Sequence, residues 1–221
     1  MNISRVLKNN VLKSSISLQI LRLSCWSCGK ENQVLVSNLF CPNCKTLQKP
    51  RKDNNYFSVL GVEETYDQNE NDLAKRYKDL QKYLHPDKFA NRDTAERDIS
   101  EEYSSLVNEA YKTLLEPMAR GIYMLKLKGT SIPESTEVLD QQFLMEIMEK
   151  NEEVENAETE EEIMKLNGEN KEVIKDLQKK VSAAFFDGDL DEVVKLLSVM
   201  KYYTSIDNQI QGLIRSKGII R

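Results

Sequence analysis

The sequence lacks the residues and motifs that many enzymes use. It has a single histidine, His85, no Gly-rich phosphate-binding loop and no Gly-x-Ser-x-Gly motif. All four cysteines fall between Cys25 and Cys44, so no cysteine elsewhere could act as a nucleophile. A nucleophile–base pair would therefore have to use His85. We predict that the protein has no catalytic activity of its own.

Long apolar runs, glycine and proline are also scarce. No stretch approaches the ~18 consecutive apolar residues of a membrane-spanning helix. Gly and Pro number eight and five in 221 residues, whereas 30% of the residues are charged. This composition is typical of a mainly α-helical protein that does not bind membranes, with one large or two small domains.

Acidic residues are absent from the first thirty positions, where every charged side chain is basic. Residues 1–24 are also rich in Ser and Asn, and their apolar residues are too interrupted for a secretory signal. We predict a mitochondrial transit peptide, with a disordered basic leader as the alternative. From Glu134 to Glu162, by contrast, twelve acidic residues stand against one basic residue, Lys150. This acidic block disfavours nucleic-acid binding.

The cysteines form two pairs, Cys25-Trp-Ser-Cys28 and Cys41-Pro-Asn-Cys44. A tight turn with this spacing presents both sulfurs to one ion, and two such turns supply the closed four-thiolate shell of structural zinc. We predict a zinc ribbon at residues 25–48, with a strand or hairpin at 33–40. Disulfides and a thioredoxin-like redox pair fit less well. We expect no iron–sulfur cluster of its own, although thiolates can hold one. The predicted ligands of one zinc ion are Cys25, Cys28, Cys41 and Cys44.

A helical hairpin is predicted next. One helix has an apolar stripe from Leu73 to Leu84 at helical spacing, and it ends where Pro86 forces a stop. A second helix has a stripe from Ile99 to Leu114 and ends at Pro117. Basic residues repeat along another face of the first helix, at Lys75, Arg76, Lys78 and Lys82.

Residues 54–128 resemble a J-domain. The specific feature is His85-Pro-Asp-Lys-Phe-Ala90, which extends beyond the bare His-Pro-Asp tripeptide. In that family this loop and the basic face of the preceding helix dock on a DnaK-class chaperone and stimulate its ATP hydrolysis. For His85 alone, the alternative is a surface histidine without a role. The resemblance implies these chaperone-binding residues: Lys75, Arg76, Lys78, Lys82, His85, Pro86 and Asp87.

Residues 137–218 are predicted to form a three-helix bundle, with breaks near Asn167-Gly168 and Asp187-Gly188. The first helix, about Leu139–Ala157, is apolar over roughly 200° of its circumference, twice the minimum width of a core stripe. Glutamates fill the rest of its surface. Either neighbouring helices bury all of the apolar surface, or part of it is left for a partner.

The segment Asp140-Gln-Gln-Phe-Leu-Met-Glu-Ile-Met-Glu149 is similar to HscB proteins, J-domain co-chaperones of iron–sulfur cluster assembly. In HscB this helix and an aromatic residue on the last helix bind the scaffold IscU. A basic leader and a tetracysteine module before the J-domain resemble the animal mitochondrial form. The resemblance implies these scaffold-binding residues: Leu144, Met145, Met148, Glu149, Glu152 and, as the aromatic, Tyr202.

The expected architecture is mainly α, with a small N-terminal zinc ribbon, a helical-hairpin J-domain and a C-terminal three-helix bundle. The expected function is to stimulate a mitochondrial DnaK-class ATPase and to deliver an IscU-type scaffold to it. We expect the mitochondrial matrix as the location, with the cytoplasm as a second one. The alternative is a general J-domain co-chaperone for another client, but the sequence lacks that type's Gly/Phe-rich linker and Cys-rich repeats.

Overall fold

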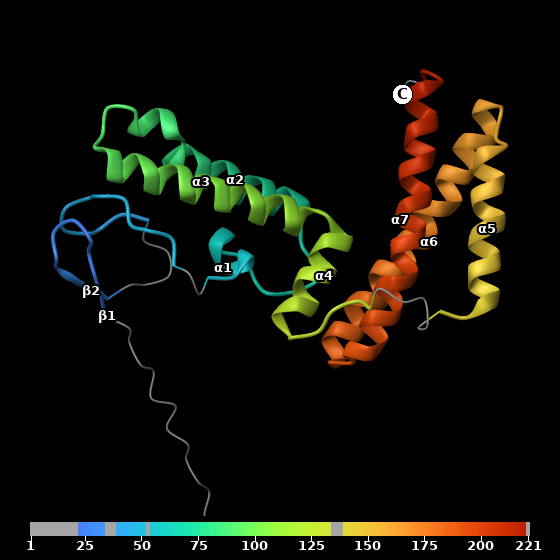
Figure 1. The fold of residues 1–221 in the computed structure, drawn as a ribbon, viewed down its shortest axis with the longest axis horizontal. Coiled ribbons are helices and arrows are strands. Elements are labelled where there is room, and N and C mark those ends of the chain that lie inside the picture. The colour runs from blue at the N-terminus through green and yellow to red at the C-terminus, as the bar shows by residue number, and fades with distance from the viewer. Residues whose placement is uncertain (1–21, 34–38, 52–53, 134–138, 220–221) are drawn as a thin grey trace, which may run out of the picture. The chain divides into compact units, whose positions relative to one another are not determined.

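The computed structural model describes residues 22–33, 39–51, 54–133 and 139–219. The chain divides into two compact units, residues 1–48 and 49–221. Helices dominate the fold (Figure 1), as the composition predicted. Among the described helices, none combines the length and apolar character that a membrane span requires. The predicted leader, residues 1–24, lies outside the described residues except for its last three.

The first unit contains a short hairpin. Strands β1 (Arg22–Ser24) and β2 (Glu31–Gln33) pair antiparallel, with Leu23 opposite Asn32. The predicted leader, residues 1–24, therefore includes the whole of β1, and its boundary falls at the end of that strand. Most of the strand predicted at 33–40 lies outside the described residues, and Phe40 forms a single antiparallel bridge with Leu47.

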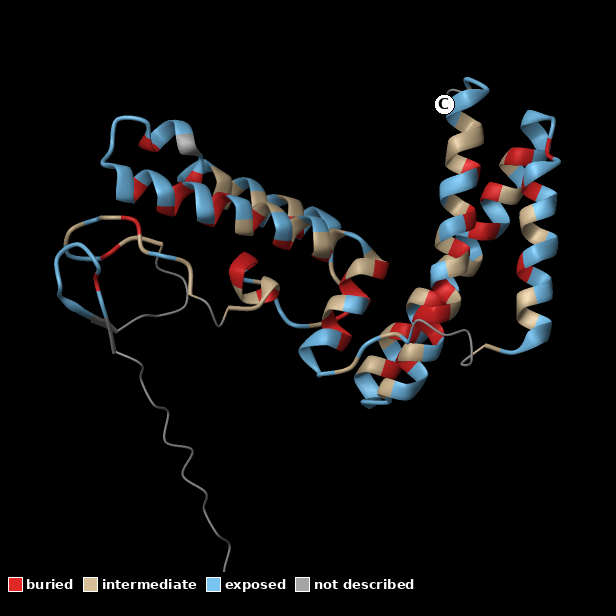
Figure 2. Cartoon of the chain, viewed as in Figure 1, coloured by how far each residue is buried: buried red, intermediate tan, exposed pale blue. Residues whose placement is uncertain are grey.

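The second unit begins with the predicted helical hairpin. Helix α2 (Glu70–Leu84) runs into a 3₁₀ turn, η1 (Pro86–Phe89), and α3 (Thr94–Leu115) returns along α2. The short helix α1 (Tyr56–Leu60) packs against α3 and α2. Buried residues recur along α1 and α3 (Figure 2), and the fully buried side chains of α1 and the hairpin include Phe57, Leu73, Leu84, Val107 and Leu114.

Pro117 separates two helices, as predicted. It cannot continue α3, because it has no N–H to donate and its ring clashes with the preceding turn. Instead it occupies the first turn of α4 (Pro117–Leu127), where a missing N–H costs nothing. Gly129, with φ 76°, follows the end of α4.

The C-terminal part is the predicted three-helix bundle of α5 (Gln141–Glu155), α6 (Glu160–Asp187) and α7 (Leu190–Ser216). The break expected near Asn167-Gly168 was wrong, because α6 continues through both residues. Asn167 is buried, and its Oδ1 accepts a hydrogen bond from Gln211 Nε2 at 3.0 Å. This tertiary contact with α7 offsets the weak helix propensity of Asn167.

Within the second unit, the helix that follows the hairpin contacts the bundle, because α4 packs on α7. The ring of Tyr66, which precedes α2, stacks on Phe185 of α6 with centroids 5.7 Å apart. The guanidinium of Arg120, a residue of α4, lies 5.2 Å from the centroid of the Tyr66 ring. Ser182 Oγ donates to Asp67 Oδ2 at 2.5 Å.

Candidate functional site

The loop between α2 and α3 presents an exposed histidine and aspartate. His85 ends α2, with its N–H still bonded to Gln81 O at 3.0 Å, and its extended ψ of 127° turns the chain into η1. Its Nδ1 accepts from the N–H of Asp87 at 3.3 Å and lies 3.4 Å from Asp87 Oδ2. The backbone hydrogen bond fixes the imidazole beside Asp87, and the two side chains remain 56% and 88% exposed.

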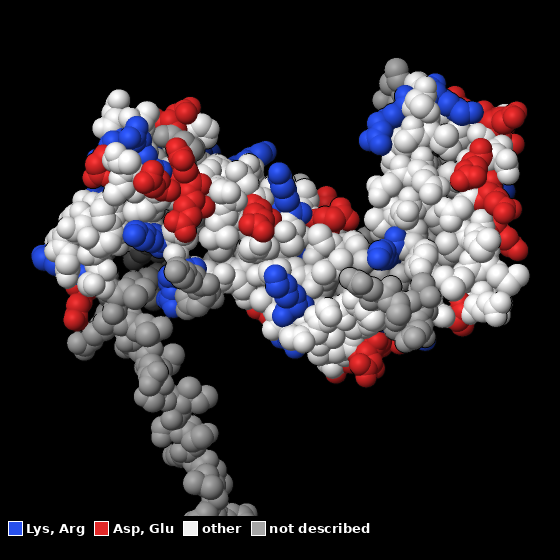
Figure 3. Space-filling model, viewed as in Figure 1, with Lys and Arg blue, Asp and Glu red and all other residues white. Residues whose placement is uncertain are grey.

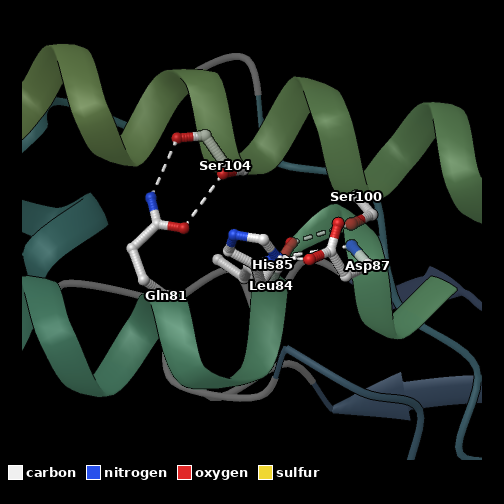
Figure 4. A network of polar contacts seen from close by, with 6 residues as sticks. All are labelled: Gln81, Leu84, His85, Asp87, Ser100 and Ser104. Atoms are coloured by element: carbon white, nitrogen blue, oxygen red, sulfur yellow. Dashed lines mark hydrogen bonds and ion pairs between the residues drawn. The ribbon is translucent and has the colours of Figure 1, made fainter.

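Polar contacts from α3 anchor the end of α2 below this loop (Figure 4). The buried Oγ of Ser100 donates to Leu84 O at 2.8 Å. One turn further along, Ser104 Oγ donates to Gln81 Oε1 at 3.0 Å, and Gln81 Nε2 donates to Ser104 O at 3.3 Å. These bonds give the loop a fixed base, since they satisfy backbone and side-chain groups that would otherwise be buried without partners.

The basic residues of α2 are exposed. Lys75, Lys78 and Lys82 follow one another at three and four positions and share one face, whereas Arg76 points about 100° away from Lys75. Lys82 Nζ donates to Asp79 Oδ1 at 2.9 Å, and this bond and the charge of Lys82 hold the pKa of Asp79 below its usual range. The positive face thus leads along α2 to the loop and is partly offset by one carboxylate.

The four cysteine sulfurs converge in the first unit and lie within 4.8 Å of one another. All four cysteines are free of disulfides. The sulfurs of Cys25 and Cys44 are 3.6 Å apart, and those of Cys28 and Cys41 are 3.9 Å apart. A tetrahedral shell with zinc–sulfur bonds of about 2.3 Å has sulfurs about 3.8 Å apart. The geometry could therefore hold a metal ion.

The two turns that carry these cysteines have the same backbone hydrogen bonds. The N–H of Cys25 donates to the carbonyl five residues later, at 2.9 Å, and the N–H of Cys41 does the same. A left-handed residue occupies the same place in each turn, Gly29 with φ 69° and Lys45 with φ 60°. This repetition explains how two short sequences bring their sulfurs to a common centre.

Polar side chains surround the sulfurs. Gln48 Nε2 donates to Cys25 Sγ at 3.4 Å, and Asn43 Nδ2 donates to Cys28 Sγ at 3.6 Å. Cys44 Sγ donates to Thr46 Oγ1 at 3.3 Å, and its interactions with the Thr46 side chain and backbone lower the pKa of the Cys44 thiol. The amide donors of Gln48 and Asn43 favour the thiolate form that binds metal ions.

The apolar surface of α5 is divided between burial and exposure. Ile147 and Val154 are buried against the bundle, while Met145 and Met148 are 56% and 63% exposed. Leu144 is half-buried between these two faces. Acidic side chains run along the exposed part of α5 (Figure 3), at Glu146, Glu149, Glu152 and Glu153.

Known proteins share this combination of domains. Residues 55–123 match the DnaJ domain family, and residues 139–211 match the HSCB C-terminal oligomerisation domain. The human iron–sulfur cluster co-chaperone protein HscB is 40% identical over 85% of this chain and 80% of its own length. The chain belongs to the HscB family. A mouse HscB is 36% identical over 85% of this chain and 81% of its own.

HscB structures have the same fold. The crystal structure of the human co-chaperone HscB is 39% identical, covers 86% of this chain and 97% of its own, and superposes with a TM-score of 0.80. The Jac1 co-chaperone of Saccharomyces cerevisiae is 27% identical, covers 74% of this chain and 95% of its own, and has a TM-score of 0.60. The expected mainly α architecture of an HscB protein is thus confirmed.

The structure brings some predicted residues together and separates others. His85 and Asp87 meet, and the four cysteines form one cluster. Tyr202, the aromatic assigned to the scaffold surface, instead packs edge-on against Phe143, with centroids 5.7 Å apart. Phe143 and Met145 are two positions apart and hence point about 200° from each other around α5. The position of Tyr202 in a scaffold site stays a prediction.

Sequence reasoning missed two residues that the structure places beside the sites. Asp79 partly neutralises the positive charge of the basic face. Its position three residues before Lys82 could have revealed this ion pair in the sequence. Phe143 orients Tyr202 by ring contact, but its apolar character alone could not separate a buried role from a binding role.

Proposed function

We propose that this HscB protein delivers an IscU-type iron–sulfur scaffold to a DnaK-class chaperone and stimulates the chaperone's ATPase. The exposed His85–Asp87 pair carries this proposal, because the fold holds both side chains in contact at the end of an exposed basic helix face. The protein itself would catalyse no reaction. Its effect on hydrolysis would be exerted by binding the chaperone through the basic face and the loop.

The second half of the proposal places the scaffold on α5. Met145 and Met148 offer flexible apolar contacts, and Glu149 and Glu152 frame them with negative charge. A complementary scaffold surface would combine an apolar patch with basic residues. Because both binding surfaces belong to one compact unit, each partner raises the local concentration of the other.

We further propose that the four cysteines hold one structural zinc ion, which would fix the first unit in the absence of a large core. The sulfur spacing and the side-chain donors support zinc, and a closed four-thiolate shell leaves no open position for catalysis. We infer import into the mitochondrial matrix from the basic, acid-free leader.

The test is chaperone ATP turnover measured with the full chain, with and without the mitochondrial cluster scaffold. Two variants separate the two surfaces. His85→Gln removes the imidazole of the loop and should abolish stimulation, while scaffold binding by pull-down stays intact. Met148→Ala removes an exposed side chain of α5 and should leave basal stimulation unchanged but remove the additional effect of the scaffold.

Stimulation that requires His85 but ignores the scaffold would leave a J-domain co-chaperone and reject scaffold delivery. No stimulation by a folded wild-type protein would reject the co-chaperone function as a whole. Lys171→Gln is the control for loss of surface charge, because Lys171 is an exposed residue of α6 outside both surfaces.

A further inference from the structure

The metal site of the first unit has one sulfur-bearing residue at its surface. Cys25 and Cys41 are buried, Cys44 is half-buried and Cys28 is exposed. A chelator or competing thiol that removes a metal ion has to reach a ligand from solvent. Cys28 therefore marks the side of the site where a bound ion is most open to attack.

Asn43 covers that side with its amide group. Its Nδ2 donates to Cys28 Sγ at 3.6 Å, and its Oδ1 accepts from Lys30 Nζ at 2.9 Å. An ammonium group can only donate hydrogen bonds, so its partner in the amide has to be the oxygen. The bond from Lys30 therefore determines that the NH₂ end of Asn43 faces the sulfur.

The three residues connect the two cysteine turns. Lys30 lies in the first turn and its carbonyl accepts the N–H of Cys25 at 2.9 Å, whereas Asn43 lies in the second turn between Cys41 and Cys44. The bonds from Lys30 to Asn43 and from Asn43 to Cys28 thus bridge the turns across the exposed side. Four thiolates on one divalent ion leave an excess of negative charge, which an N–H donor and a nearby cation both stabilise.

We propose that Asn43, oriented by Lys30, is a positioning residue that holds the Cys28 thiolate and slows the loss of the metal ion. This inference rests on the metal site proposed above. Partners that orient metal ligands in proteins typically change metal affinity by about 10–100-fold when they are removed. We expect an effect at the lower end of that range, because this bond is exposed to solvent.

The experiment measures zinc release from the full chain to a chromogenic chelator, for the wild type, Asn43→Ala, Lys30→Met and the double variant. Asn43→Ala should release zinc about 10-fold faster. Lys30→Met should have a smaller effect, and it should add nothing once Asn43 is gone, because Lys30 acts through the amide. Lys45→Met, which removes the same charge from the other turn, is the matched control and should release zinc like the wild type.

The absorption spectrum of bound cobalt(II) supplies a second measurement, which would not change if Asn43 had only a structural role. With cobalt in place of zinc, Asn43→Ala should shift the sulfur-to-metal charge-transfer band to lower energy, because a thiolate that loses a hydrogen bond donates electrons more readily. The ligand-field bands of tetrahedral cobalt should persist and thereby show that the site still forms.

Three results would overturn the inference. Unchanged zinc release by Asn43→Ala would remove the role of the amide. Equal effects of Lys30→Met and Lys45→Met, additive with Asn43→Ala, would leave only a general charge effect. A wild-type chain that binds neither zinc nor cobalt would remove the metal site and this inference together. Chaperone stimulation is measured in a separate assay, so a failure of the proposed co-chaperone function would be distinguishable from a failure of this inference.

Discussion

The Ser100 hydroxyl and the Leu84 carbonyl form a buried hydrogen bond of 2.8 Å between α3 and the last residue of α2. Leu84 immediately precedes His85, and its carbonyl is one of the last four of the helix, which have no partner inside the helix. Ser100 supplies that partner from the neighbouring helix. The position of the exposed loop is therefore set from beneath by a side chain that no solvent reaches.

Removing this hydroxyl should loosen the loop without touching its exposed residues. Ser100→Ala leaves the Leu84 carbonyl buried and unpaired, which costs about 1–3 kcal/mol. We expect a matching drop in the free energy of unfolding in urea and a partial loss of chaperone stimulation. Ser105→Ala, at an exposed serine of the same helix, should change neither. Equal behaviour of the two variants would show that Ser100 does not support the loop.

Substitutions at two neighbouring residues of α5 should affect stability and scaffold binding separately. Ile147 is 4% exposed and Met148 is 63% exposed. Ile147→Ala should lower the free energy of unfolding by about 2–5 kcal/mol, because it leaves a cavity in the bundle.

Met148→Ala should leave the urea midpoint nearly unchanged while weakening scaffold binding in a titration calorimetry experiment. A large stability loss from Met148→Ala would instead mean that the side chain packs in solution. Unchanged scaffold affinity would place the binding surface elsewhere.

Much of the architecture could be predicted from local signals. Asn69 caps α2 through its side chain, Pro117 separates two helices, and Gly188, with φ 76°, ends α6 as a left-handed cap. These signals act over a few residues, so one sequence is sufficient to locate them. The paired Cys-x-x-Cys spacing located the cysteine cluster for the same reason.

Long-range contacts could not be predicted in this way. Asn167 and Gly168 are weak helix formers, yet α6 continues through them because Gln211, 44 residues away, bonds Asn167. The division of α5 into a buried and an exposed apolar face depends on where α7 lies. The assignment of Tyr202 rests on the resemblance to HscB proteins alone, whereas its ring contact with Phe143 appears only in three dimensions.

Tyrosine ionisation should lower stability at alkaline pH. Burial, with the hydrogen bond and charge of Glu109, raises the pKa of Tyr56 to about 12, against about 10 in an unfolded chain. Between these values the folded state keeps a proton that the unfolded state releases, so the free energy of unfolding falls as pH rises.

Tyr56→Phe should therefore make urea stability less dependent on pH between about 10 and 12. It should also cost about 0.5–1.5 kcal/mol at neutral pH, where the bond to Glu109 is lost. Tyr83→Phe, at an exposed phenol, is the matched control. An identical pH slope in wild type and Tyr56→Phe would contradict the raised pKa of Tyr56.

The contact between α4 and α7 requires a residue without a side chain. A Cβ at Gly121 would lie 2.7 Å from Leu197 Cδ2 and 3.3 Å from Tyr66 Cε2. Leu197 is fully buried, so it has little room to move away. Gly121→Ala should therefore lower the free energy of unfolding by about 1–3 kcal/mol, because overpacking outweighs the better helix propensity of alanine.

Gly168→Ala provides the matched control, since Gly168 also lies inside a helix but has open space around it. That substitution should stabilise the protein by up to about 1 kcal/mol. Because α4 joins the J-domain to the bundle, Gly121→Ala should also reduce the scaffold-dependent part of chaperone stimulation more than the basal part. If both alanines stabilised the protein equally, the close packing of α4 on α7 would not exist in solution.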